Sequence, residues 1–89
     1  MLSHQQDATR ILRRKEVEAH SGLARSTLYQ RISEGLWSKP VHIGARAVGW
    51  PSREVSALIE ARIAGLGDQE IRDLVRTLEA RRKASAISV

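Results

Sequence analysis

Polar side chains that can recognise nucleic acid lie on one side of a predicted helix at residues 24–34. Leu28 and Ile32, four residues apart, form the apolar side of this helix. The other side carries hydroxyl, amide, phenol and guanidinium groups, in Arg25, Ser26, Thr27, Tyr29, Gln30 and Arg31. Groups of these kinds hydrogen-bond to base edges in the major groove and to phosphates. The segment therefore fits a DNA recognition helix, although an ordinary amphipathic surface helix would carry a similar pattern.

The positive charge of the chain is concentrated beside this helix. The net charge of the 89 residues is +5. Residues 25–53 contain five basic residues and only one acidic residue. The segment after Gly65 holds five basic and four acidic residues and is nearly neutral. A basic surface attracts polyanions over long range. Many basic surfaces are merely solvated, but the overlap with the predicted helix favours a nucleic-acid partner.

The sequence offers little for catalysis or metal binding. It has no cysteine, which excludes disulfides, thiolate zinc sites and cysteine nucleophiles. The three histidines are scattered without ligand spacing, and no glycine-rich phosphate loop follows a predicted strand. We interpret Glu16, Glu18, Glu54 and Glu60 as solvated charges on helix faces. We therefore expect no enzyme activity, no metal and no cofactor.

Two short helices must position the recognition side chains. Residues 15–20 are predicted to form the first helix, which ends at the Ser21-Gly22 pair, with Leu23 as the apolar plug of a tight connection. The second helix, residues 24–34, is expected to end at Gly35. Two short helices joined by a glycine-containing turn are typical of a helix-turn-helix.

A small β-hairpin is predicted after the second helix. Residues 41–43 and 48–50 alternate apolar with other positions on either side of a turn at residues 44–46. Arg46 at the tip of this hairpin would reach a flanking phosphate or a narrow minor groove, as the wing of a winged helix-turn-helix does. Lys39, just before the hairpin, is a further candidate for a phosphate contact.

Two more helices are predicted in the rest of the chain. Ser52 is expected to cap a helix at residues 53–64, and residues 65–67 form a glycine-containing linker. Asp68 is expected to cap a last helix at residues 68–84.

One side of the last helix is apolar and requires a partner surface. The stripe consists of Ile71, Leu74, Val75 and Leu78. It could pack against the core of its own chain or against a neighbouring protomer. We favour self-association slightly, because the glycines before the helix resemble a hinge and because protomers joined along DNA would multiply their contacts.

Together these elements predict a mainly α fold with a small β-hairpin, a winged helix-turn-helix over residues 10–64 followed by a C-terminal helix. Residues 1–9 and 85–89 are predicted to be flexible tails. Trp37 and Trp50 are expected to fill the core, with their indole N–H groups near water or a carbonyl. No apolar run approaches a membrane span or a signal-peptide core, so we expect a soluble, cytoplasmic protein that is not exported.

The sequence also resembles a known family. The runs RSTLYQRISEG, KPVHIGARAVGW and REVSALIEARIA are similar to those of the AlpA-type regulators, over about residues 10–64. The resemblance implies a small DNA-binding winged helix-turn-helix of a phage or integrative element, related in fold to the DNA-binding part of MerR regulators. It assigns DNA contacts to Arg25, Ser26, Thr27, Tyr29 and Arg31 in the helix, and to Lys39 and Arg46 around the wing.

The sequence departs from the family pattern at four positions. Ala24 replaces the usual Ser or Thr cap of the recognition helix, which should cost about 0.5–2 kcal/mol unless another group satisfies the free N–H groups. Lys15 and Ser38 stand where prolines are frequent, and Gly49 where a basic residue is frequent. Gly49 should weaken the contact of the wing with phosphate, so Arg46 is the main candidate in this part of the chain.

The function expected from these features is sequence-specific DNA binding in the control of a mobile element. The protein would act as an excisionase, as a regulator of integrase genes, or as both. Its partners would be double-stranded DNA, further copies of itself and an integrase. We expect no association with a membrane. Arg25, Tyr29 and Lys39 would hold phosphates, while Ser26, Thr27, Gln30 and Arg31 would read bases. The alternative is an interaction adaptor that docks through its C-terminal helix.

Overall fold

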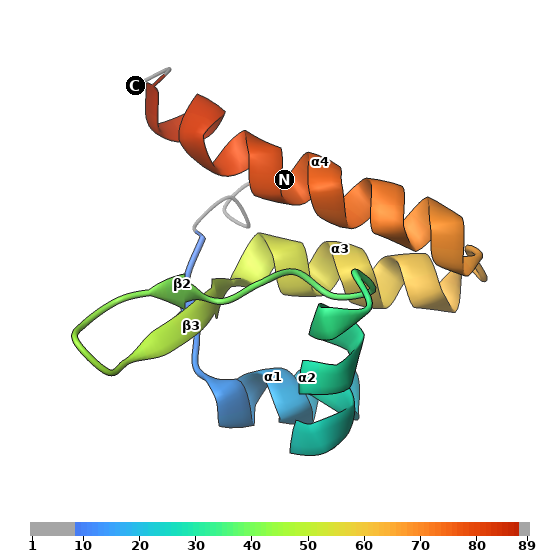
Figure 1. Ribbon diagram of the computed structural model, residues 1–89, viewed down its shortest axis with the longest axis horizontal. Coiled ribbons are helices and arrows are strands. Elements are labelled where there is room, and N and C mark those ends of the chain that lie inside the picture. The colour runs from blue at the N-terminus through green and yellow to red at the C-terminus, as the bar shows by residue number, and fades with distance from the viewer. Residues whose placement is uncertain (1–8, 88–89) are drawn as a thin grey trace, which may run out of the picture.

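The computed structural model describes residues 9–87 and consists of four helices and a small sheet (Figure 1). The elements are β1 (Ile11–Leu12), α1 (Arg14–Ser21), α2 (Arg25–Ser33), β2 (Val41–His42), β3 (Val48–Pro51), α3 (Ser52–Ile63) and α4 (Asp68–Ile87). The winged helix-turn-helix with a C-terminal helix is thus confirmed. Most of the predicted N-terminal tail, residues 1–8, and residues 88–89 of the C-terminal tail lie outside the described residues.

The helix-turn-helix has the predicted bounds to within one residue. Gly22 ends α1 with φ of 76°, and Gly35 follows α2 with φ of 77°. Glycine adopts this left-handed conformation without the steric cost that a Cβ imposes. Leu28 is fully buried, and Ile32 packs against the core from a partly exposed position. The apolar side predicted for α2 is therefore the side that faces the core.

The wing is larger than the predicted hairpin because β1 adds a third strand. The antiparallel order is β1-β3-β2, with Leu12 paired to Trp50 and Val41 paired to Gly49. The prediction that Ser52 caps α3 is wrong, because Pro51 is the N-cap residue and Ser52 is the first residue of the helix. The Ser52 hydroxyl instead accepts a hydrogen bond from the Arg10 N–H at 2.9 Å, and the Ser52 N–H donates to the Arg10 carbonyl.

Both tryptophans lie in the core, as predicted. Trp37 is 3% exposed and Trp50 is fully buried. The indole N–H of Trp50 donates to the Ser38 carbonyl at 2.9 Å. The indole Nε1 of Trp37 and the Ser38 hydroxyl are buried without a hydrogen-bond partner among the described residues. The expectation of water or a carbonyl near the indole N–H is thus confirmed for Trp50.

Helix α4 packs on its own chain, which corrects the expectation that its apolar stripe meets a second protomer. Figure 1 shows α4 along one side of α3, with α1 and α2 on the other side. Ile71, Val75 and Leu78 are 1%, 5% and 7% exposed in the single chain, and Leu74 is partly buried against the same core. A side chain that is already buried has no apolar area left to contribute to another contact.

The ends of α4 also differ from prediction. The helix continues to Ile87 rather than fraying after residue 84. Asp68 is its first residue rather than its cap, because the Ile71 N–H already donates to the Gly67 carbonyl. The Gly67 N–H in turn donates to the Glu70 carboxylate at 2.9 Å, which is one half of a capping box.

Glu54 is not the solvated helix-face charge that its position on α3 suggested. It is 1% exposed, and its two carboxylate oxygens accept hydrogen bonds from Nε and Nη2 of Arg82 on α4, at 2.8 and 2.6 Å. This bidentate contact satisfies a carboxylate that would otherwise be costly to bury. The hydrogen bond with Glu54 raises the pKa of Arg82 above its ordinary value, so the guanidinium stays charged at any physiological pH.

Candidate nucleic-acid interface

The outer side of α2 presents the polar side chains that the sequence predicted. Arg25, Ser26 and Gln30 are exposed, and Thr27 is half-buried. The amide nitrogen of Gln30 donates to the Glu34 carboxylate at a long 3.3 Å, within the same helix. The face is therefore open to solvent, and within residues 9–87 its hydrogen-bonding groups are unpaired or, at Gln30, weakly held.

The N-terminus of α2 keeps the free backbone N–H groups that the sequence anticipated. Ala24 is the N-cap residue, with extended φ and ψ of −72° and 161°, and no side chain in the described part of the protein caps it. The uncapped N–H groups and the helix dipole together give this end a partial positive charge. Such an end suits an anion, and a phosphate in particular.

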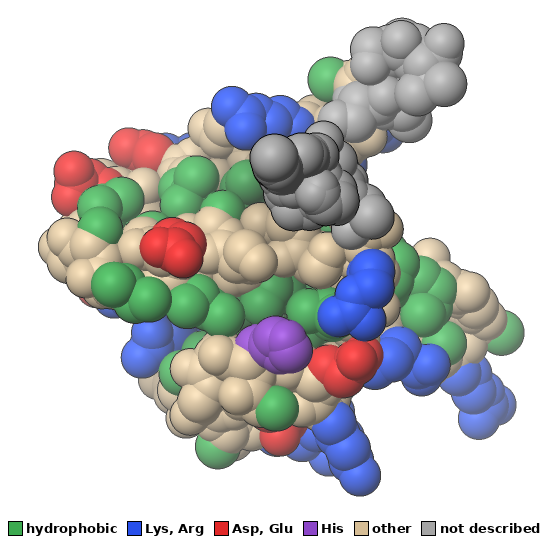
Figure 2. All heavy atoms as spheres, turned by 180° about the vertical axis from the view of Figure 1, so that it is seen from behind, with side chains coloured by type: hydrophobic (Ala, Val, Ile, Leu, Met, Phe, Trp, Pro, Cys, Tyr) green, Lys and Arg blue, Asp and Glu red, His purple; other side chains and the backbone are tan. Residues whose placement is uncertain are grey.

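A basic hollow lies between the start of α1, the middle of α2 and the wing. It is open, has a volume of about 350 Å³, and is lined by Arg13, Arg14, Lys15, Tyr29, Arg46 and Val48. Among the described residues, no Asp or Glu lines it. Figure 2, a view from behind, shows Lys and Arg side chains at the lower edge of the molecule, where α1 lies, and toward the wing, with an acidic side chain among them. We call this feature the basic hollow.

Trp50 positions Tyr29 at the basic hollow. The two rings meet edge to face, with 6.4 Å between their centroids and 64° between their planes. Tyr29 is 39% exposed while Trp50 is fully buried, so the core holds one edge of the tyrosine and leaves the rest at the surface. This contact brings the predicted phosphate ligand Tyr29 close to Arg46 of the wing.

Sequence reasoning missed the three cations that begin α1. Arg13, Arg14 and Lys15 lie before the stretch in which we counted the basic residues. Arg14 is partly engaged by Glu18 at 2.5 Å, whereas Arg13 and Lys15 are exposed. Three consecutive cations at the start of a helix are unusual, because the helix dipole disfavours positive charge there. This unfavourable placement was the available signal.

Arg31 and Lys39 lie away from the basic hollow. Arg31 is half-buried on the opposite flank of α2, in a mainly apolar groove that it shares with Leu23, Ile59 and Ile63. Lys39 is exposed beside α4. The structure therefore gathers Tyr29 and Arg46 but places these two cations on other sides of α2.

The described residues form no candidate metal site. Within residues 9–87, no group of three or more His, Asp or Glu side chains is arranged to hold a metal ion. None of the described helices is both long and apolar enough to cross a membrane.

The helix-turn-helix, the three-stranded wing and the basic hollow between them define a winged helix-turn-helix protein. The sequence profile of the prophage CP4-57 regulatory protein (AlpA) family matches residues 10–63, more than half of the chain. The chain belongs to this family of regulatory proteins, and the resemblance found in the sequence is confirmed.

A phage protein is similar to part of the chain. The uncharacterized protein ORF88 of Enterobacteria phage P4 is 43% identical over 56 residues. The aligned segment covers 63% of this chain and 64% of that protein, so the chain spans less than two thirds of its relative. No solved structure matches the chain.

Proposed function

We propose that this protein is a sequence-specific DNA-binding regulator of a phage or integrative element. The observation that carries the proposal is the basic hollow, which joins the polar face of α2 to the wing without an acidic lining residue among those described. A duplex whose major groove receives α2 would bring its backbone toward the two sides of that helix. The cations of the hollow would meet this backbone on the side of the wing.

The proposed contacts fall into two classes. Ser26, Thr27, Gln30 and Arg31 read base edges in the major groove. Phosphates are held by the N–H groups that begin α2 and by the side chains of Arg25, Tyr29, Lys39, Arg46, Arg13 and Lys15. Arg31 has to leave its groove beside Leu23 to reach a base, which makes it the contact that most needs a direct test.

We further propose that the regulated process is the excision of the element, the expression of its integrase genes, or both. Membership of a prophage regulatory family supports this range of roles. An excisionase would bind next to the attachment site, bend the DNA and recruit the integrase, whereas a transcriptional regulator would bind the integrase promoter. Several copies side by side would use a surface other than the stripe of α4, which is buried within the chain.

One footprinting experiment tests the proposal. The protein is titrated onto labelled fragments of the element's attachment site and integrase promoter, with random DNA as competitor. Protection of a short segment that survives the competitor supports sequence-specific binding, and its location separates excision from transcription. Binding that the competitor abolishes at every concentration would contradict sequence specificity. Absence of binding would favour the adaptor alternative, although the docking surface proposed for it is the buried side of α4.

A further inference from the structure

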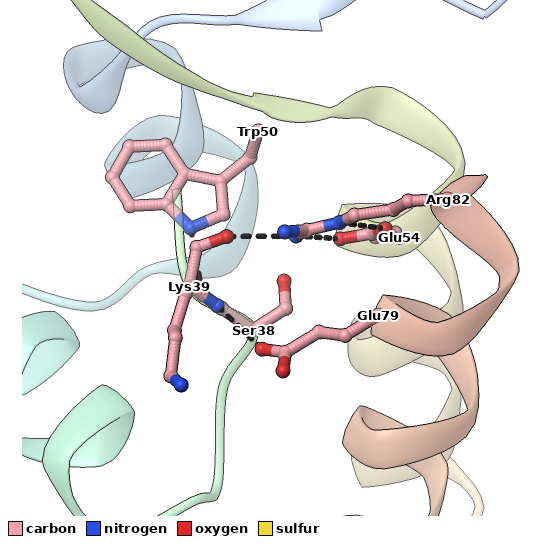
Figure 3. Close-up of polar contacts among 6 residues, drawn as sticks. All are labelled: Ser38, Lys39, Trp50, Glu54, Glu79 and Arg82. Carbon is pink, nitrogen blue, oxygen red and sulfur yellow. Dashed lines mark hydrogen bonds and ion pairs between the residues drawn. The ribbon is translucent and has the colours of Figure 1, made fainter. Parts of the chain in front are cut away.

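Three charged side chains of α4 reach the chain segment that connects the recognition helix to the wing. Nε of Arg72 donates to the Glu34 carbonyl at 2.9 Å, at the C-terminal end of α2. The carboxylate of Glu79 accepts from the Lys39 N–H at 2.8 Å. Nη2 of Arg82 donates to the Lys39 carbonyl at 2.7 Å. Figure 3 shows the last two contacts, which together bind both backbone groups of Lys39.

The connecting segment depends on these contacts because it has little regular structure of its own. Residues 37–40, all of them described, belong to neither a helix nor a strand. The Ser38 carbonyl is taken by the indole N–H of Trp50, and the N–H and carbonyl of Lys39 are taken by α4. Side chains thus supply the hydrogen bonds that backbone partners supply elsewhere in the protein.

The three side chains share one edge of α4. Arg72 and Glu79 are seven residues apart, and Arg82 follows Glu79 by three, so all three lie next to the buried seam of Ile71 and Leu78. The buried seam fixes α4 on the core. The three charged side chains can then hold the connecting segment at a fixed distance from α4. Arg72 also places a cation at the C-terminal end of α2, where the helix dipole favours it.

We infer that α4 is a clamp that sets the position of the recognition helix relative to the wing, with Arg72, Glu79 and Arg82 as positioning residues. The inference rests on the proposed DNA binding for its functional consequence. The clamp fixes the end of α2 and the start of the path to β2, so the base-reading face and Arg46 keep one spacing. A fixed spacing favours one DNA geometry over others, which raises discrimination between sites rather than general affinity.

The test compares two double variants of α4 that have the same net charge. Arg72→Ala/Glu79→Ala removes two of the three clamping side chains and leaves the buried Glu54–Arg82 pair intact. Asp73→Ala/Arg76→Ala, the control, removes an exposed ion pair from the same helix. Each double variant loses one cation and one anion and gains two good helix formers. Hydrogen exchange at the Lys39 amide is measured without DNA, and affinity is measured on the footprinted site and on random DNA.

The clamp variant should exchange the Lys39 amide about tenfold faster than the parent, because its acceptor is gone. Its preference for the footprinted site over random DNA should fall by about tenfold, with affinity for random DNA unchanged. The control variant should match the parent in both measurements. Glu79→Gln keeps an acceptor oxygen and should also match the parent. If the clamp variant proves unfolded by circular dichroism, the single variants Arg72→Ala and Glu79→Ala carry the same test with smaller changes.

The two measurements separate the clamp from the DNA-binding proposal. If the parent binds no DNA while the Lys39 amide responds as expected, the proposed function fails and the clamp remains. If the parent discriminates between sites and the clamp variant discriminates equally well, the positioning role is overturned. An unchanged Lys39 amide in the clamp variant would overturn the clamp itself.

Discussion

Gly49 of the wing lies directly beneath Ile11 of the neighbouring strand. A Cβ at position 49 would overlap with Cγ2 of Ile11 and would lie 3.0 Å from the Leu12 carbonyl oxygen. A Cβ at this position therefore requires the Ile11 side chain, or β1 itself, to shift. The absence of a basic residue at position 49 thus has a structural reason in this chain.

We predict that Gly49→Ala lowers the free energy of unfolding by about 1–3 kcal/mol, through overpacking. Part of that cost should disappear in the Ile11→Ala background, with a coupling of about 0.5 kcal/mol or more, since the alanine removes Cγ2. Urea denaturation of the parent, the two single variants and the double variant measures this coupling. Gly44→Ala is the control, because its Cβ would meet only Ala47 at 3.6 Å, and its cost should stay below about 1 kcal/mol. Additive costs of the two substitutions would show that Ile11 is not the obstacle.

The basic hollow predicts a salt dependence that can be divided among its members. Each cation that neutralises a phosphate contributes about 0.9 to the slope of log affinity against log salt. Arg13→Ala and Arg46→Ala should therefore each reduce the slope by about 0.9, although Arg13 lies outside the helix-turn-helix contacts predicted from the sequence. Arg81→Ala, on the exposed part of α4, is the control and should leave the slope unchanged. A slope that is insensitive to Arg13 would exclude this side chain from the interface.

Arg31 and Arg46 should have separable effects on DNA binding. Arg31→Ala is expected to cost about 1–3 kcal/mol on the preferred site and to relax discrimination at one base position. Arg46→Ala should weaken binding to all sequences about equally, unless the side chain enters a narrow minor groove. Affinities for the preferred site and for a set of single-base variants measure both effects. Parent-like binding by both variants would contradict the assignment of helix and wing.

The buried Glu54–Arg82 pair predicts a large effect from a single substitution on α4. Arg82→Met should lower the free energy of unfolding by about 3–5 kcal/mol, because it leaves the Glu54 carboxylate buried without its partner. Adding Glu54→Gln removes that charge and should recover most of the loss. Arg76→Met, on the exposed side of the same helix, should cost less than about 1 kcal/mol. Thermal unfolding of these variants decides the matter, and equal effects of Arg82→Met and Arg76→Met would contradict the structure.

The local features of the fold could be predicted from the sequence because they depend on neighbouring residues. Gly22 and Gly35 determine where α1 and α2 end, and the spacing of Leu28 and Ile32 determines which side of α2 is buried. Alternation on both sides of a turn predicted the wing. In each case the signal and its consequence lie within a few residues of each other.

The contacts over long sequence distances could not be predicted in this way. The spacing of Ile71 and Leu78 predicts an apolar stripe, but it does not indicate whether the partner surface lies in the same chain or in another. The burial of Glu54 depends on Arg82, 28 residues later, and no local pattern marks the two as a pair. The outer face of α2 was predictable for the same reason as its buried side, whereas the convergence of Arg13 and Arg46 required the tertiary structure.

The segment that matches the family is shorter than the folded unit, because the core of that segment is completed by α4. The family match ends at residue 63, yet the carboxylate of Glu54 inside it is neutralised by Arg82 outside it, and α4 covers α3. A chain that shares only residues 10–63 has to cover that face with some other segment. Grafting these residues into a chimeric regulator would therefore transfer the proposed DNA-binding surface without its support. The transplantable unit includes α4 at least as far as Arg82.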